Sequence, residues 1–418
     1  MKPQEILPSQ KNTLPGVSLA SALFSRGWLQ DYFAPILSFI ILLSIVIFDY
    51  LVLGLDYLYD PQPNLSTIGL VQLAVIFLSA VLLVVPIARK HSVAVIIQQK
   101  NSQQIEQNLT FSFGRLGNLS LSPLLLVWGA LLFSVSLVFL FVLSPGLFFR
   151  LSVEDHLIEM LSVLFLFLAC GYFCLLATQT RHINVKPKMF YLAALVLLAL
   201  ALFFIGMEEI SWFQRSFSIV TPDLFRENQQ QEMNLHNFAT NEIEILYYFF
   251  SFLFFILLPF INDRTLLFSR LSQVSFFIPG LLILFISAPF AAFNYNLWNI
   301  PTTQFSFFVT LLILLHYTYL SFRGQLNQPF GKYYLTVLFI VYVVTQLIFL
   351  IRGDTFIRTW DVTEYKELLV PFSFFVYSLT IIMKSRQVIS LRFVLLTCVI
   401  TLLLIFLRIL PKVSVYFL

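Results

Sequence analysis

Long apolar runs separated by short polar stretches fill the chain from about residue 34 onwards. A membrane-spanning helix needs about 20 mostly apolar residues, within a range of about 17–25. The pattern predicts an all-α, polytopic transmembrane helical bundle of 11 spans, with ten spans as the alternative because Pro279 and Pro289 interrupt the seventh. The predicted spans lie near 34–55, 67–88, 123–144, 157–177, 189–207, 245–262, 274–296, 303–321, 333–351, 368–384 and 391–409.

Composition supports a membrane protein and excludes most soluble classes. The chain is 59% hydrophobic and only 11% charged, and its mean hydropathy is +0.88. A soluble domain carries about 25% charged residues, so membrane lipid is the expected surrounding of this chain. The net charge is +4 and the basic residues are dispersed between apolar runs, so no nucleic-acid partner is expected.

The distribution of charge along the chain predicts its orientation. With the N-terminus in the cytoplasm, 17 of the 25 lysines and arginines fall in cytoplasmic segments, as the positive-inside rule requires. Sixteen of the 21 acidic residues then lie outside. Three regions follow from this topology: a cytoplasmic tail over 1–33, two spans with a glutamine-rich cytoplasmic loop over 34–122, and a main bundle over 123–418 whose polar site includes the 208–244 loop.

The loop after the fifth span is the most polar stretch outside the predicted membrane. Glu208 and Glu209 fall at the lipid–water boundary, and on a continuing helix Glu208, Trp212 and Arg215 would share a face. Thr221, followed by Pro222, has the pattern of a helix N-cap. The four-residue spacing of Asn228, Glu232 and His236 predicts that these three side chains share one face of a helix.

A second acidic cluster is expected beside this loop. Glu154, Asp155, His156 and Glu159 lie at the outer end of the fourth span. A charged side chain at the bilayer centre costs about 2.5–3.5 kcal/mol on insertion scales, so such residues usually face a cavity or a partner. Arg215 is a natural partner for one of these carboxylates.

These residues suit two kinds of catalysis. A divalent metal such as Zn²⁺ or Mg²⁺ could be held by His236, Glu232 and Glu208, leaving a water to attack an ester or phosphate. Alternatively, one carboxylate acts as general acid or base while Arg215 binds an anionic head group. A third interpretation is purely structural: ion pairs and caps that close the ends of spans four to six. The candidate catalytic set is Glu208, Glu209, Arg215, Glu232, His236, Glu154, Asp155 and Glu159.

Charged residues also occupy the stretch from 352 to 366. The stretch carries charges of both signs, which predicts a solvated outside loop; these residues are Arg352, Asp354, Arg358, Asp361, Glu364 and Lys366. Arg352 and Arg358 are able to bind a phosphate in such a loop.

Around spans four to six the chain resembles a family of bacterial multi-span membrane proteins of uncharacterised activity. The family pattern runs E-D, an E one turn later, E-E-I-S-W-G-Q-R, a T-P-E step and N-x-Q-G-E-x-N-L-H-N. This sequence departs from it at Phe213 and Gln231, where the family has glycine, and at Asp223, where it has glutamate. The resemblance implies an integral, multi-pass protein of the bacterial cytoplasmic (inner) membrane and implies no activity. The matching residues are Glu154, Asp155, Glu159, Glu208, Glu209, Ile210, Ser211, Trp212, Gln214, Arg215, Thr221, Pro222, Asn228, Gln230, Glu232, Asn234, Leu235, His236 and Asn237.

Three classes of function fit the sequence. An enzyme acting on a lipid or lipid-linked glycan at the extracytoplasmic membrane surface best explains the clustered carboxylate, histidine and arginine side chains. A non-catalytic assembly factor or scaffold is the main alternative. A transporter fits less well, because the chain has only 14 glycines and its charges fall at predicted span ends.

Overall fold

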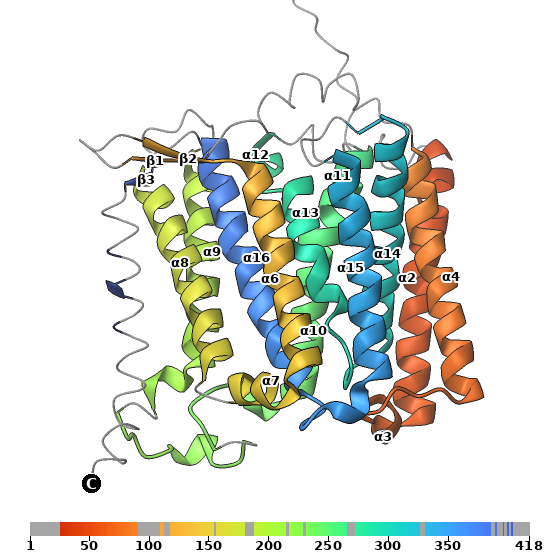
Figure 1. The fold of residues 1–418 in the computed structure, drawn as a ribbon, viewed down its shortest axis with the longest axis horizontal. Helices are drawn as coiled ribbons and strands as arrows, with labels where there is room; N and C mark the ends of the chain where they lie inside the picture. Colours follow the sequence, from red (N-terminus) through yellow and green to blue (C-terminus); the bar gives the residue numbers. More distant parts are fainter. Residues whose placement is uncertain are drawn as a thin grey trace, which may run out of the picture.

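The chain forms a bundle of roughly parallel and antiparallel helices (Figure 1). A computed structural model describes residues 26–90, 109–112, 118–153, 156–179, 188–214, 217–228, 231–265, 272–326, 331–385, 389–390 and a few single positions from 396 to 403. In this part of the chain, ten helices are long and apolar enough to cross a membrane. The protein is therefore an all-α, multi-pass membrane protein, as the hydrophobic pattern predicts. The eleventh predicted span, 391–409, lies mostly outside the described residues, as do residues 1–25 of the N-terminal tail.

The first five spans alternate in direction along the bundle. Helix α7 lies at the end of the bundle that also carries the loop after α9, which we call the polar end (Figure 1). The elements in this half are α2 (Arg26–Phe48), η1 (Asp49–Leu53), α3 (Leu55–Leu58), α4 (Thr67–Arg89), β1 (Leu109–Ser112), β2 (Asn118–Leu121), α6 (Pro123–Leu143), α7 (Pro145–Ser152), α8 (Leu157–Gln179) and α9 (Lys188–Glu209).

The second half contributes five further spans and the loop between α9 and α10. Its elements are η4 (Ser211–Phe213), η5 (Asp223–Phe225), η6 (His236–Phe238), α10 (Thr240–Phe252), η7 (Leu253–Leu257), α11 (Leu258–Thr265), α12 (Ser272–Ser275), α13 (Leu281–Ser287), η8 (Ala288–Ala292), α14 (Pro301–Phe322), α15 (Gly331–Ile351), η9 (Gly353–Thr355), α16 (Asp361–Ser385) and β3 (Ile389–Ser390). Strand β1 pairs antiparallel with β2 and parallel with β3, at the end opposite the polar end.

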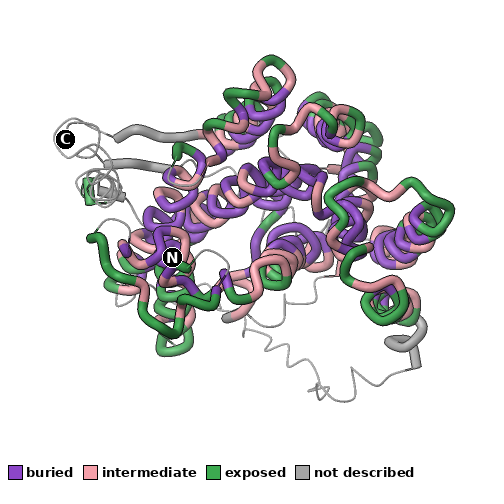
Figure 2. The backbone as a smooth tube through the Cα atoms, turned by 90° about the horizontal axis from the view of Figure 1, so that it is seen from below, coloured by how far each residue is buried: buried purple, intermediate pink, exposed green. Residues whose placement is uncertain are grey.

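Spans differ in how much of their surface other helices cover. The apolar window of the first span is 17% buried, whereas those of the seventh span and of α16 are 72% and 67% buried. Figure 2 shows the same contrast as buried backbone in the middle and exposed backbone at the margin. Side chains on the marginal helices, such as Leu143 and Leu197, are exposed and apolar, as contact with lipid requires.

The seventh span is broken inside the bundle. Pro279 and Gly280 separate α12 from α13, and η8, which contains Pro289, leads into an irregular segment over 293–300. The interruption predicted at the prolines is confirmed. Irregular backbone is tolerated at membrane depth only where protein or water satisfies its polar groups. Here the amide of Asn299 donates to the carbonyl oxygens of Asp60 and Gln62, and so ties the segment to the loop after α3.

Among the helices that begin earlier than the hydrophobic pattern predicts, α10 and α16 start at the polar end. Helix α10 begins at Thr240 instead of 245, and α16 begins at Asp361 instead of 368. The stretch from 361 to 366 is therefore helix and not a solvated loop, and the side chains of Asp361 and Lys366 are 0% and 3% exposed. The prediction of a solvated loop was wrong because helix packing covers these charges, and a hydropathy window cannot register packing.

Candidate functional site

A network of hydrogen bonds organises the loop that follows α9. The carboxylate of Glu208 accepts bonds from the backbone N–H groups of Leu235 (2.5 Å) and His236 (3.4 Å). It also accepts a bond from the indole of Trp212 at 2.8 Å. The imidazole Nδ1 of His236 lies 3.8 Å from the same carboxylate. Glu208 therefore joins the end of α9 to the far side of the loop.

Helix α9 ends at Glu209. Glu208, Trp212 and Arg215 could share a face only if the helix continued. Ser211, Trp212 and Phe213 have φ values of 47°, 52° and 61°. This left-handed conformation costs roughly 1–2 kcal/mol per residue for side chains other than glycine. The expected continuing helix was wrong, and local side-chain bonds, including a contact of the Ser211 hydroxyl with Glu232, hold the turn instead.

Asn228, Glu232 and His236 do not lie on one face of a helix either. The Asn228 amide donates to the carbonyl oxygens of Glu232 (2.6 Å) and Asn234 (3.2 Å), and its Oδ1 accepts from the backbone N–H of Glu232. These bonds close an irregular loop in which Asn228, Glu232 and Asn234 are buried. Four-residue spacing misled here because an asparagine side chain can bond local backbone in place of a helix.

The step at Thr221 and Pro222 also differs from its expected form. Only a three-residue 3₁₀ turn begins there, and Pro222, not Thr221, holds the N-cap position. The Thr221 hydroxyl instead accepts a bond from Gln214 and donates to the carbonyl of Gln231. We call the side chains that build this loop the loop network: Glu208, Ser211, Gln214, Thr221, Asn228, Glu232 and Asn234.

Two positions of the loop carry side chains where the resembling motif has glycine. Phe213 and Gln231 have φ values of 61° and 56°. Positive φ is the conformation for which glycine is the default residue. The backbone geometry thus gives a physical reason for glycine at these two positions, although this chain has none there.

The predicted site residues fall into two groups in space. Glu208 and Glu232 belong to the loop network, whereas Glu159, in the first turn of α8, and Glu209, at the end of α9, interact electrostatically with glutamates of α10 and α16. Glu154, Asp155 and Arg215 lie outside the described residues.

The metal site predicted from His236, Glu232 and Glu208 is not assembled. Within the described residues, no group of three or more histidine, cysteine, aspartate or glutamate side chains is arranged to hold a metal ion. Glu208 lies beside His236, whereas Glu232 is directed toward Ser211 and Asn234. The three ligands separate because the loop network uses the two carboxylates to bond different parts of the loop.

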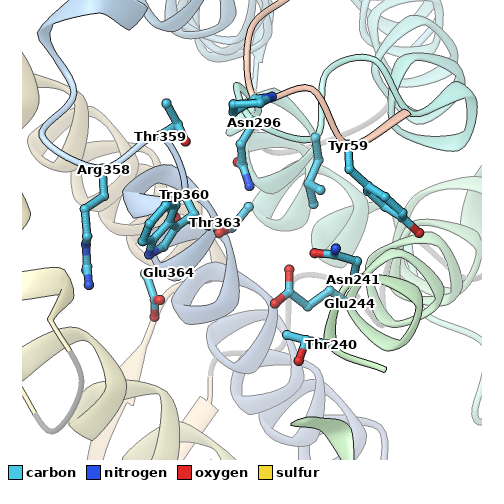
Figure 3. A pocket seen from close by; sticks show the side chains of 12 residues that line it. Tyr59, Thr240, Asn241, Glu244, Asn296, Arg358, Thr359, Trp360, Thr363 and Glu364 are labelled. Atoms are coloured by element: carbon cyan, nitrogen blue, oxygen red, sulfur yellow. Dashed lines mark hydrogen bonds between the residues drawn. The ribbon is translucent and has the colours of Figure 1, made fainter. Parts of the chain in front are cut away.

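A cavity of about 510 Å³ opens at the polar end, between α10, α16 and the irregular segment. Figure 3 shows the carboxylates of Glu244 and Glu364 entering it from two different helices. We call these two side chains the cavity glutamates. The complete lining is Tyr59, Pro61, Thr240, Asn241, Glu244, Asn296, Leu297, Arg358, Thr359, Trp360, Thr363 and Glu364.

Sequence reasoning missed both cavity glutamates as site residues. Glu364 was placed in a solvated loop, and Glu244 lay one residue before the predicted sixth span. Each lies in the first turns of a helix, three residues after Asp361 or four after Thr240. Glu244 and Glu364 precede the predicted span starts at 245 and 368 by one and four residues, so a check of the acidic residues just before each predicted span would have found them.

Beneath the cavity, a lysine is buried among polar partners. The ammonium of Lys366 donates to Asn294 at 2.7 Å and lies 4.3 Å from the centre of the Tyr248 ring. The Asn294 amide in turn donates to Gln346 of α15, and Gln346 donates back to the Asn294 carbonyl. The broken seventh span thus supplies the polar atoms that hold a buried charge.

Glu367 completes a group of interacting charges around the lysine. Its carboxylate accepts a bond of 2.9 Å from the hydroxyl of Tyr248. Glu244 interacts electrostatically with Glu367, His236, Glu209 and Lys366, and Glu364 interacts with Glu367, Glu159, Glu244 and Glu209. Charges this close interact strongly because the protein interior screens them less than water does.

The rim of the cavity is fixed by an ion pair and by a neutral tyrosine. Arg358 bonds the carboxylate of Asp361 through two nitrogens at 2.9 Å, and the hydroxyl of Ser152 donates to the same carboxylate. On the other side, burial and then the Glu242 carboxylate raise the pKa of Tyr59 to about 12. The Tyr59 hydroxyl donates a hydrogen bond to the Glu242 carboxylate.

Comparison of the chain with protein-family models, with curated proteins and with solved structures gave no match. The resemblance to the bacterial membrane-protein family therefore stays a prediction. The class that the fold defines is a multi-pass membrane protein with a polar cavity at one end of its bundle.

Proposed function

We propose that this protein is a membrane enzyme that acts on a lipid-linked glycan at the extracytoplasmic face of the bacterial inner membrane. The observation that carries the proposal is the cavity whose walls present Glu244 and Glu364 from two helices. A cavity at the end of the bundle suits a head group that stays attached to a lipid in the bilayer. The excess of basic residues in the opposite loops supports the extracytoplasmic orientation.

The lining of the cavity suits a carbohydrate. Asn241, Asn296 and Thr363 offer neutral hydrogen-bonding groups, and the half-exposed ring of Trp360 offers an apolar face. Binding pockets commonly combine aromatic surface with a few placed polar groups in this way. A hydrocarbon-only ligand would leave these polar groups without partners.

The cavity glutamates suit general acid–base chemistry. In the proposed reaction, one carboxylate takes the proton from an attacking hydroxyl as that oxygen forms a bond to the anomeric carbon of the sugar. The bond from the same carbon to the lipid phosphate breaks, and the lipid phosphate leaves with its bonding electrons. Such proton transfer contributes about 10²–10⁴-fold to a rate. Lys366 acts as a positioning residue, since its ammonium lies among Glu244, Glu367 and Asn294 and not on the cavity wall.

The broken seventh span supports a second candidate, an ion-coupled transporter. Discontinuous helices and ionisable groups inside the bundle are typical of transporter sites. Asn294 and Lys366 meet this description. A transporter of ions or small solutes would move its substrate without changing the pool of lipid-linked glycans, and that difference separates the two candidates.

The test replaces single carboxylates and measures lipid-linked glycans by mass spectrometry in cells that lack the native protein. Glu244→Gln and Glu364→Gln remove an acid–base group, so we expect each to leave the substrate accumulated as in cells without the protein. Glu242→Gln is the matched control, because Glu242 is two residues away on α10, bonds Tyr59 and does not line the cavity. It should restore the normal profile at equal protein abundance.

Two results would contradict the enzyme. Normal glycan profiles in both cavity-glutamate variants would remove these side chains from the chemistry. An unchanged pool of lipid-linked glycans in cells without the protein would exclude this substrate class and leave the transporter or a non-catalytic assembly factor.

A further inference from the structure

An apolar groove of about 230 Å³ runs along the membrane-facing side of the bundle between α6 and α15. From α6 it is lined by Val135, Val138, Phe139 and Val142, which form one stripe at helical spacing. From α15 it is lined by Ile340, Val341, Val344, Thr345 and Ile348. At a rise of 1.5 Å per residue these stripes are roughly 10–12 Å long, about the length of half a lipid chain.

An arginine lies where this groove meets the polar end. Arg352 directly follows α15, and its guanidinium donates to the carbonyl of Val142, a residue of the groove, at 3.3 Å. Its backbone N–H continues the helix by bonding Ile348, another groove residue. Within the described residues, no carboxylate lies at ion-pair distance from Arg352, in contrast to Arg358, which pairs with Asp361.

We propose that the groove and Arg352 together bind one anionic phospholipid, with a hydrocarbon chain between α6 and α15 and the phosphate on the guanidinium. A guanidinium has five N–H donors in a fork that matches phosphate oxygens, and the Val142 carbonyl uses only part of this capacity. The guanidinium of Arg352 lies at one end of the apolar groove, just as the charged head group of a phospholipid lies at one end of its hydrocarbon chain.

The site goes beyond the proposed enzyme and does not depend on it. No residue of the groove lines the polar cavity. The backbone next to Arg352 packs tightly against the rest of the bundle. Gly353 lies so close to Tyr295 that an added Cβ would lie 1.9 Å from the ring. Tyr295 precedes Asn296, a residue of the cavity lining, so Gly353 and Tyr295 connect the position of Arg352 to the cavity wall.

The test places a fluorescent reporter in the groove. Phe139 is 58% exposed, so Phe139→Trp can be made without loss of core packing. The protein is reconstituted in vesicles that mix phosphatidylcholine with phosphatidylglycerol, one of them carrying brominated chains that quench tryptophan. The wild-type chain, measured in parallel, gives the signal of its own five tryptophans for subtraction. We expect stronger quenching by brominated phosphatidylglycerol than by brominated phosphatidylcholine at equal mole fraction.

Three further variants in this background locate the determinant. Arg352→Gln should lower the preference for phosphatidylglycerol about fivefold, the effect expected of one arginine near a membrane surface. Arg323→Gln should retain it, because Arg323 ends α14 at the opposite end of the bundle. Val344→Phe, at an exposed groove position, should reduce quenching by both lipids.

Two outcomes would overturn the inference: equal quenching by the two lipids in Phe139→Trp, or the same preference in Arg352→Gln as in Arg323→Gln. The first would show that the groove takes any lipid chain. The second would show that the arginine does not select the head group.

Discussion

The loop network and the cavity glutamates lie at the same end of the bundle and differ in what their polar atoms contact. Glu208 accepts two backbone N–H groups and an indole, and Asn228 donates to two carbonyl oxygens. Glu244 and Glu364 face an open cavity, and the charges nearest to them belong to other glutamates, His236 and Lys366. One region uses its side chains to replace missing secondary structure, and the other leaves them open to a cavity.

A dense polar motif is therefore not by itself a reaction centre. An irregular loop needs partners for its backbone groups, and side chains such as asparagine and glutamate supply them. A site for chemistry needs the reverse: polar groups that the fold leaves accessible and that rigid helices hold in place. The α10 and α16 glutamates meet these requirements better than the side chains of the loop network.

The largest expected effect comes from the buried lysine beneath the cavity. Lys366→Met removes the cation beside Glu244 and Glu367 and leaves Asn294 without its donor. Leaving a buried carboxylate without a compensating cation typically costs about 3–5 kcal/mol, so we expect a marked loss of stability. Thermal unfolding in detergent, followed by circular dichroism, measures it.

A double variant separates charge from packing. Lys366→Met combined with Glu367→Gln also removes a negative charge, and the glutamine still accepts the bond from Tyr248. It should recover part of the stability that Lys366→Met loses. If the double variant is less stable than the single one, the lysine serves packing and the charge argument fails.

The loop network predicts a smaller, local effect. Glu208→Ala removes the acceptor of the Leu235 and His236 N–H groups. Hydrogen bonds to charged groups contribute about 1.5–3 kcal/mol, so hydrogen exchange at these amides should become faster while the helices keep their protection. Exchange followed by mass spectrometry resolves the two regions.

Glu227→Ala is the matched control for this variant, since Glu227 is an exposed glutamate of the same loop. It should leave exchange at 235 and 236 unchanged. Faster exchange throughout α10 and α16 in Glu208→Ala would mean that the loop network and the cavity form one cooperative unit, and that the two regions do not have separate roles.

The spans could be predicted from sequence because each depends on local hydrophobicity alone. Their ends were less predictable. The first turns of α10 and α16 contain Glu244, Glu364 and Lys366, so their hydropathy is low. A hydropathy window therefore does not detect these turns, which packing against other spans stabilises. Propensity and periodicity describe a segment by itself, whereas burial of Lys366 depends on Asn294, 72 residues earlier in the chain.

The loop after α9 shows the opposite limit. Glu208, Glu232 and Asn228, which the sequence picks out, are half-buried or buried and hydrogen-bonded. Their spacing was read as helical, and the backbone is instead left-handed at Ser211, Trp212 and Phe213. Three successive residues other than glycine with positive φ are so uncommon that no local pattern would predict them.

The smallest expected effect is a stabilisation, and it comes from another residue of the loop with a positive φ. Gln231 has a φ of 56°, its side chain is exposed, and its backbone bonds Asn228 and Thr221. Gln231→Gly removes a conformational penalty of roughly 1–2 kcal/mol, partly offset by about 0.5–1 kcal/mol of extra freedom in the unfolded chain. Exchange in the loop should therefore slow slightly.

Leu224→Gly is the control, at an exposed position that lacks a positive φ. It has only the unfavourable contribution of glycine to the unfolded chain and should make exchange in the loop faster. If both glycine variants loosen the loop equally, its conformation stores no strain, and hydrogen bonds alone would distinguish the loop network from the cavity glutamates.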